Sequence, residues 1–72
     1  MKTEKIGANA GVIWRTLHAS DSDMSVAALI NVTGLSMFEV STAIGWLARE
    51  NKIIIKETEE GCLLNVFKEY YY

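Results

Sequence analysis

Apolar residues recur every three to four positions through the first quarter of the chain, which is the spacing of one face of an α-helix. Polar residues such as Asn9 and Arg15 occupy other positions around the same helical wheel. The pattern predicts a helix over residues 4–19, whose buried stripe consists of Ile6, Ala10, Ile13 and Leu17.

Two glycines, Gly7 and Gly11, lie one helical turn apart within this first helix. Each costs about 1 kcal/mol of helix stability relative to alanine. We therefore expect another backbone to approach the helix closely on the side of these glycines.

The sequence Ser-Asp-Ser-Asp at residues 20–23 predicts a polar loop. Ser25 can then cap a short helix over residues 26–33 by accepting a hydrogen bond from an early backbone N–H. Gly34 stands where that helix must end, because glycine reaches the positive φ of a helix C-terminus without a Cβ penalty. The buried stripe of this helix is predicted to be Val26, Leu29 and Ile30.

The clearest local signal is the sequence Ser-Met-Phe-Glu at residues 36–39. It has the form of a capping box, in which the Ser36 hydroxyl accepts from the Glu39 N–H and the Glu39 carboxylate accepts from the Ser36 N–H. A third helix over residues 37–50 follows, and Asn51 closes it as a residue that tolerates the left-handed conformation. Its buried stripe is predicted to be Val40, Ala43, Ile44 and Leu47.

After residue 52 the apolar pattern changes to that of strands. Two apolar runs, 53–55 and 62–67, flank the sequence Thr58-Glu59-Glu60-Gly61, which has the form of a type I turn. This arrangement predicts a hairpin over residues 53–67 with Thr58 opposite Gly61 and a bulge at Gly61. In that register one face, which we expect to cover the helices, carries Ile53, Ile55, Glu57, Cys62, Leu64 and Val66, and the other carries Ile54, Lys56, Leu63 and Asn65.

These elements follow one another in the order of a winged helix-turn-helix domain. The segment Ala43–Glu50 is similar in particular to short, stand-alone bacterial winged-helix proteins classed as a domain of unknown function. The resemblance implies an α+β fold, a three-helix winged helix-turn-helix with a C-terminal two-stranded β-hairpin wing. Residues that resemble the helix-turn-helix core of the superfamily are Val26-Ala27-Ala28-Leu29, Thr33-Gly34-Leu35-Ser36, Val40-Ser41, Ala43-Ile44, Leu47 and Ile53.

Length and composition indicate the number of domains and the compartment of the protein. The 72 residues have surface enough for one hydrophobic core and half of them are apolar, so we expect a single domain over residues 1–72. No run approaches the roughly 20 apolar residues that span a bilayer, and no uninterrupted apolar segment indicates a signal peptide. Because Cys62 is the single cysteine, the chain fits a reducing compartment, and we expect a cytoplasmic protein without a membrane partner.

The superfamily resemblance implies a DNA-binding transcriptional regulator, with the third helix in the major groove of double-stranded DNA and the wing on the neighbouring backbone. Of the positions that would face the groove, Arg49 alone is basic, and the formal net charge of the chain is −2. The wing tip carries three glutamates beside Lys56, an arrangement that phosphates would repel. The groove-facing positions are Met37, Phe38, Ser41, Thr42, Gly45, Trp46 and Arg49, and the candidate DNA contacts are Ser41, Thr42, Arg49, Lys52 and Lys56.

The alternative hypothesis is a protein-interaction or homodimerisation module that keeps the winged-helix scaffold without reading DNA. The chain has more large apolar residues than the helical stripes and one hairpin face need, and an exposed apolar patch usually marks an interface. For Trp46, packing within the domain ranks ahead of a partner contact, and DNA contact ranks third. The candidate interface residues of a two-fold dimer are Trp46, Ile54, Leu63, Phe67, Tyr70, Tyr71 and Tyr72.

The residue patterns support no enzyme class, no metal site and no bound cofactor. His18 stands at the end of the first helix, where a protonated imidazole favours the helix C-terminus. One histidine and one cysteine, without ligand spacing, do not make a zinc site. Cys62 is predicted on the core face of a strand with no base beside it, so we interpret it as a small hydrophobe rather than a nucleophile.

Overall fold

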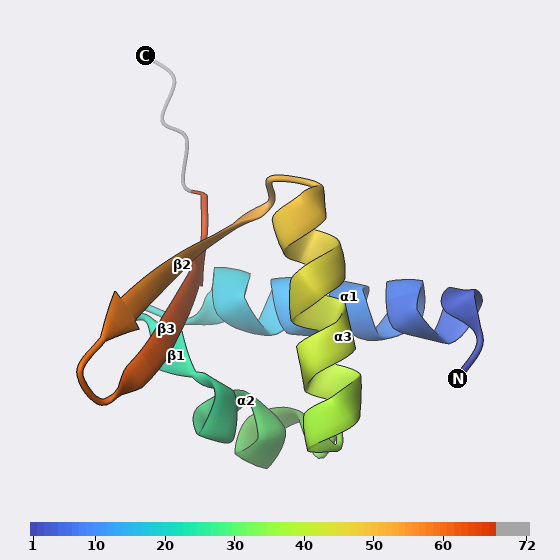
Figure 1. The fold of residues 1–72 in the computed structure, drawn as a ribbon, viewed down its shortest axis with the longest axis horizontal. Coiled ribbons are helices and arrows are strands. Elements are labelled where there is room, and N and C mark those ends of the chain that lie inside the picture. Colours follow the sequence, from blue (N-terminus) through green and yellow to red (C-terminus); the bar gives the residue numbers. More distant parts are fainter. Residues whose placement is uncertain (68–72) are drawn as a thin grey trace.

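The computed structural model describes residues 1–67 and contains three helices and a three-stranded antiparallel sheet. Figure 1 shows α3 crossing in front of α1, with α2 at one end of α3 and the hairpin to the side of the helices. The α+β class expected from the sequence is confirmed. In chain order the elements are α1 (Thr3–Ala19), β1 (Met24–Ser25), α2 (Val26–Thr33), α3 (Met37–Arg49), β2 (Ile53–Thr58) and β3 (Gly61–Val66).

The sheet has a third strand that the sequence pattern did not predict. β1 is only two residues long and pairs with β3, so that Met24 lies opposite Leu64 and Ser25 opposite Leu63. β3 is thereby the central strand, between β1 and β2. Two residues cannot display the alternation that identifies a strand in a sequence, and only the partner strand defines this one.

The register of the hairpin is the predicted one. Thr58 lies opposite Gly61, and the pairing continues residue by residue until Ile53 lies opposite Val66. The bulge predicted at Gly61 is wrong, because Gly61 and Cys62 each have their own partner on β2. The prediction that this whole face covers the helices is wrong, because Ile55 is 43% exposed and Cys62 is exposed as well. The hairpin extends beyond the ends of the helices (Figure 1), so only its base has a helical layer to cover.

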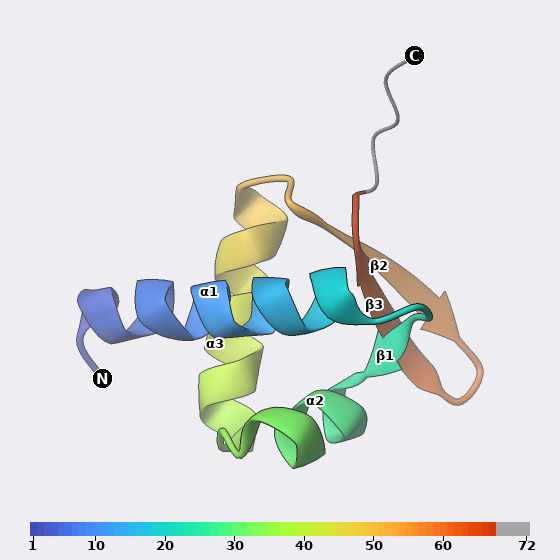
Figure 2. The same cartoon turned by 180° about the vertical axis from the view of Figure 1, so that it is seen from behind.

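The core lies between α1, α3 and the base of the sheet. Figure 2, which views the molecule from behind, shows α1 running across α3. The prediction that Asn9 lies outside the buried stripe of α1 is wrong. Asn9 is 3% exposed, and its Nδ2 has no hydrogen-bond partner among residues 1–67. The buried core residues are Ala10, Ile13, Leu17, Leu29, Val40, Ala43, Leu47, Ile53, Leu64 and Val66, with Val26, Ile30 and Ile44 partly buried against them and Ile6 half-buried.

The two glycines of α1 meet side chains rather than another backbone. A Cβ built on Gly7 would lie 3.9 Å from Cζ2 of Trp46, and one built on Gly11 would lie 3.3 Å from the guanidinium of Arg15. The expected close approach of a second backbone is therefore wrong. The glycines instead leave open space beside α1.

Local sequence determines where the helices begin and end. The Ser25 hydroxyl accepts from the N–H of Ala28 at 3.1 Å, and Gly34 ends α2 in the left-handed region with φ of 74°. At α3 the capping box is complete. The Ser36 N–H donates to Oε1 of Glu39 at 2.9 Å, and the Glu39 N–H donates to the Ser36 hydroxyl at 3.1 Å.

The capping box also sets the charge state of Glu39. The Ser36 backbone N–H, and after it the Ser36 hydroxyl, hold the pKa of this carboxyl below its ordinary value of 4.5. Desolvation opposes these two bonds by raising the pKa, and the charge of Lys5 lowers the pKa by a smaller amount. The ionised carboxylate is thus the form that the folded helix stabilises.

Replacing Glu39 with glutamine is expected to remove a stabilising contribution that depends on pH. Because the pKa of Glu39 is lower in the folded than in the unfolded chain, the contribution is complete above about pH 4.5 and disappears as the pH falls through the folded-state pKa. Urea denaturation from neutral pH downward measures it, with Glu60→Gln at the exposed wing tip as the matched control. We expect the wild-type advantage over Glu39→Gln to shrink in acid, and a pH-independent difference would contradict this assignment.

Candidate functional site

α3 presents an outward line of residues on the side away from the core. Ser41, Gly45 and Arg49 are exposed along it, and at its N-terminal end Met37 and Phe38 are each 65% exposed. Two of the predicted DNA contacts, Ser41 and Arg49, therefore lie on the same accessible line. Along its whole length the line carries one cation, Arg49, whereas surfaces that read bases usually present several Arg, Lys, Asn or Gln side chains.

Thr42, another predicted contact, is turned partly inward. Its side chain is half-buried, and its hydroxyl donates to the backbone carbonyl of Glu39 at 3.1 Å. A hydroxyl has a single proton to donate, and here that proton serves the helix itself. Thr42 would have to give up this bond to donate to a phosphate.

Lys56 lies in an ion pair. Its Nζ is 3.0 Å from Oδ2 of Asp23, and Oδ1 of the same carboxylate accepts from Nδ2 of Asn65 at 2.8 Å. The carboxylate thus ties both strands of the hairpin to the segment before β1. A phosphate would have to compete with Asp23 for Lys56, and Glu57, Glu59 and Glu60 are exposed nearby at the wing tip.

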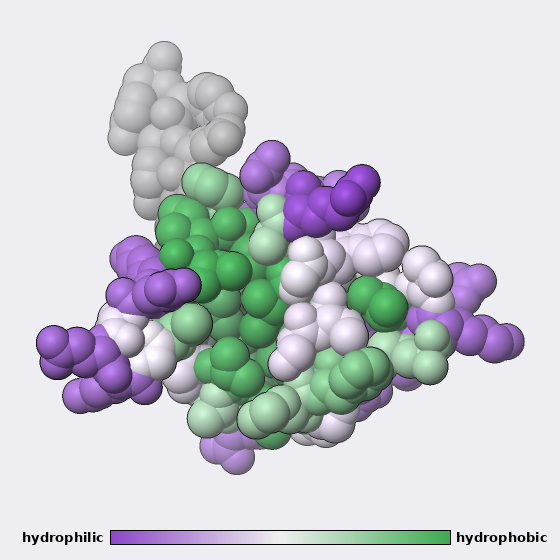
Figure 3. All heavy atoms as spheres, viewed as in Figure 1, coloured by the Kyte–Doolittle hydropathy of each residue, from purple (hydrophilic) through white to green (hydrophobic). Residues whose placement is uncertain are grey.

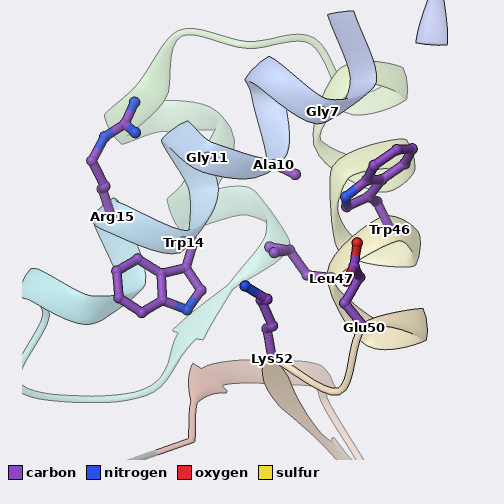
Figure 4. Close-up of a pocket in the computed structure, with 9 residues that line it drawn as sticks. All are labelled: Gly7, Ala10, Gly11, Trp14, Arg15, Trp46, Leu47, Glu50 and Lys52. Atoms are coloured by element: carbon purple, nitrogen blue, oxygen red, sulfur yellow. The ribbon is translucent and has the colours of Figure 1, made fainter. Parts of the chain in front are cut away.

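Lys52 is directed by the end of α3. Asn51 has φ of 58°, its N–H donates to the Ala48 carbonyl at 3.1 Å, and the Lys52 N–H donates to the Leu47 carbonyl at 3.0 Å. This pair of bonds is the Schellman arrangement, which reverses the chain. Figure 4 shows the Lys52 side chain extending toward α1, between Trp14 and Trp46.

The end of the Lys52 side chain enters a hollow between α1 and the C-terminal half of α3, here named the α1–α3 hollow. Its volume is about 450 Å³, and it is open to solvent on one side. Trp14 and Trp46 stand on opposite sides of it, and Lys52 reaches into the space between them (Figure 4). The lining residues are Gly7, Ala10, Gly11, Trp14, Arg15, Trp46, Leu47, Glu50 and Lys52.

Several hydrogen-bond donors face this hollow unused. Within residues 1–67, no group accepts a hydrogen bond from the indole N–H of Trp14 or Trp46, and the Lys52 ammonium has no ion pair. Figure 4 shows both indole nitrogens on the edges that are turned toward the hollow. With Arg15 and Lys52 against Glu50, the lining has more positive than negative charge on a chain whose net charge is −2.

Sequence reasoning did not identify the α1–α3 hollow, although part of the signal was present. Gly7, Gly11 and Trp14 recur at intervals of four and three residues, which places them on one face of α1. What the pattern lacks is the opposite wall, because Trp46 belongs to another helix far along the chain. The ring of Trp14 is also stacked on His18, with centroids 4.7 Å apart and an interplanar angle of 20°, in the last turn of α1.

The predicted interface residues in the described part of the chain come from α3, both strands of the wing and the residue after β3. Trp46 is 38% exposed at the α1–α3 hollow and Phe67 is 49% exposed beyond β3. Ile54 and Leu63 are half-buried on the outer face of the wing. Ile54 lies directly opposite Asn65, and Leu63 lies directly opposite Lys56. Asn65 and Lys56 are the two residues that contact the Asp23 carboxylate. Tyr70, Tyr71 and Tyr72 lie outside the described residues.

Exposed apolar side chains gather instead on the face formed by α3 and the near side of the wing, here named the α3–wing face. Figure 3 shows apolar residues running from the hairpin across to α2 and the start of α3, with hydrophilic residues around the margin. On the elements that make up this region, the large apolar residues with exposed fractions of 43% to 65% are Val32 of α2, Met37 and Phe38 of α3, and Ile55 of β2. Val32 has no predicted role and Ile55 is predicted in the core, so half of these four residues are not evident from the sequence pattern.

Other site chemistries find little support in the part of the chain that the structure describes. No group of three or more His, Cys, Asp or Glu side chains there could hold a metal ion. No single helix is both long enough and apolar enough to cross a membrane; α2 and α3 reach that threshold only as a pair, and the chain bends by 114° between them.

Three comparisons place the chain among known proteins. Residues 1–66 match the family described as "Winged helix-turn-helix domain (DUF2582)". An uncharacterized protein of Methanocaldococcus jannaschii is 35% identical over 63 residues, which cover 86% of this chain and 90% of that protein. The solution NMR structure of a protein from Bacteroides thetaiotaomicron superposes with a TM-score of 0.81 at 30% identity, over all of this chain and 95% of that one.

Proposed function

The chain belongs to the winged helix-turn-helix family DUF2582, and on that premise we propose that it is a protein-interaction module that forms a homodimer through its α3–wing face. This is the face that winged-helix proteins commonly turn toward DNA. Here it offers a surface better suited to another protein.

The observation that carries the proposal is the apolar character of that face. Met37 and Phe38 are each 65% exposed at the start of α3, and Ile55 of the wing is 43% exposed. Each such side chain gains roughly 1.5–3 kcal/mol when it is fully buried. Apolar residues gathered on one face of a small domain are typical of interaction sites, whereas DNA-reading surfaces are rich in Arg and Lys.

Gly45 supports the same proposal from the backbone. It lies in the middle of α3 on the outward line, where glycine costs about 1 kcal/mol relative to alanine. A Cβ built on Gly45 would meet no atom within 4 Å, so the fold itself gives no reason for the missing side chain. A partner backbone or helix that packs closely against α3 at this point would provide one.

A second copy of the chain is the partner that this face suits. In a two-fold dimer the same apolar patch meets itself. Met37 and Phe38 of each copy are then buried, and no charged side chain has to be buried without a partner of opposite charge. The only charged group on the outward line is Arg49, at its C-terminal end, where it can remain at the solvated rim. The outer face of the wing, chosen from the sequence, is less suitable because its polar cluster interrupts Ile54 and Leu63.

Sedimentation equilibrium on the wild-type chain tests this proposal. We expect a reversible monomer–dimer equilibrium with the dimer dominant at high micromolar concentration. A purely monomeric mass under those conditions would overturn it.

Duplex DNA binding is a second candidate function, favoured by the exposure of Ser41 and Arg49 on one line of α3. If α3 contacts a duplex, Arg49→Ala is expected to weaken binding and to reduce the slope of log K against log salt by about one phosphate contact. Lys56→Ala is the matched control, because Lys56 already pairs with Asp23 and should leave the slope unchanged. Fluorescence anisotropy with mixed-sequence duplexes measures both. Equal slopes for wild type and Arg49→Ala would exclude this helix face from DNA contact.

A further inference from the structure

We propose that the α1–α3 hollow is a binding site for a small molecule that combines a flat aromatic body with one anionic group, a carboxylate or a phosphate. None of the residues that line the hollow belongs to the exposed apolar residues of the α3–wing face. The proposed ligand binding therefore does not depend on whether the chain dimerises. Its volume of about 450 Å³ lies within the range of about 300–1,000 Å³ that is usual for small-molecule sites.

The walls of the hollow suit an aromatic ligand. Trp14 on α1 and Trp46 on α3 face the space from opposite sides, as Figure 4 shows, so that a planar group between them would contact an indole on each side. Trp46 is 38% exposed, which leaves much of its ring available. Contacts between aromatic rings add to the gain from apolar burial alone.

The floor is held open by residues without large side chains. Gly7, Ala10 and Gly11 lie along the α1 side of the hollow. The two glycines weaken α1, yet a Cβ on Gly7 would make only an ordinary contact, at 3.9 Å, with Trp46. A Cβ on Gly11 would meet only the end of the flexible Arg15 side chain. Packing within the domain therefore does not require glycine at either position. A ligand that occupies the space beside them would account for both.

The unused donors indicate the anionic group. The Lys52 ammonium enters the hollow without an ion pair among the described residues, and two indole N–H groups border the same space without acceptors there. Trp14 is half-buried, and the N–H of a Trp that is partly removed from water usually has an acceptor, whereas Lys52 and Trp46 are exposed and hold their donors at the solvent side of the hollow. A carboxylate or phosphate oxygen would satisfy them with charge-assisted hydrogen bonds, while Glu50 on the same lining disfavours a ligand with several negative charges.

The two tryptophans give the test a direct readout, because the chain has no others and both line the hollow. We would titrate the full chain with 2-naphthoate and follow the two indole N–H signals in ¹H–¹⁵N spectra. We expect saturable shifts of both signals. The neutral analogue 2-naphthamide should bind at least about tenfold more weakly, because it lacks the charge that Lys52 recognises.

Two variants examine the floor and the cation separately. Gly11→Leu fills the floor and should abolish the shifts, while backbone spectra verify that the fold is kept. Lys52→Gln leaves the floor intact and should weaken naphthoate at least about tenfold while leaving naphthamide unchanged; Lys2→Gln, remote from the hollow, is its matched control. The proposal is overturned if 2-naphthoate produces no saturable shift of the indole signals, or if 2-naphthamide binds as tightly as 2-naphthoate. It is also overturned if Gly11→Leu and Lys52→Gln both bind 2-naphthoate with the wild-type affinity.

Discussion

Replacing Phe38 with glutamate is expected to convert the dimer to a monomer while the fold is retained. Phe38 is 65% exposed, so the domain loses little packing when the ring is removed. The residue is the second of α3, and a carboxylate in the first turn interacts favourably with the helix dipole. The variant should therefore be at least as well folded as wild type, which separates association from stability.

The size of the expected effect follows from symmetry. A two-fold interface contains the substitution twice, so the loss of apolar burial alone amounts to about 3–6 kcal/mol, or roughly a 10²- to 10⁴-fold weaker dimer. Burying two unpaired carboxylates would add to this loss. Sedimentation equilibrium over a range of concentrations measures the dissociation constant.

Ala8→Glu is the matched control for this substitution. Ala8 is exposed on α1, the helix that Figure 2 places on the opposite side of the molecule from α3, and the variant introduces the same carboxylate. We expect its dissociation constant to equal that of wild type. A dimer that survives Phe38→Glu but dissociates with Ala8→Glu would place the interface on α1 and reject the α3–wing face.

Leu64→Ala is expected to destabilise the fold more than any surface substitution, by about 2–5 kcal/mol. Leu64 is 1% exposed and lies on the central strand, between Met24 of β1 and Ile55 of β2. A chain of 72 residues has a total stability of about 4–11 kcal/mol on the usual scale per residue. The variant should therefore be close to unfolding at room temperature, which urea denaturation monitored by circular dichroism would show.

Leu63→Ala provides a control with the same chemical change one residue earlier. Leu63 points to the outer face of the sheet and is only half-buried, so we expect a markedly smaller loss of stability. Equal losses at positions 63 and 64 would contradict the observed register, because a slip of one residue exchanges the two faces of the strand.

The sequence by itself determined those features that depend on neighbouring residues. The Ser36–Glu39 capping box, the left-handed residues Gly34 and Asn51, and the pairing of Thr58 with Gly61 were all predicted and are all present. Each is decided within a few residues by backbone sterics and short hydrogen bonds, so a local pattern contains the information needed. The order of these elements was then enough to indicate a winged helix.

Only the tertiary structure decided which side chains meet across the fold. The α1–α3 hollow joins Trp14 to Trp46, and the ion pair of Asp23 with Lys56 joins a loop to the wing. The same is true of the exposure of Ile55, where alternation identified the face of the strand but not how far the helices extend beneath it. Periodicity specifies the direction of a side chain relative to its own element, whereas burial and partnership depend on where other elements end, and that is settled by packing between segments far apart in the chain.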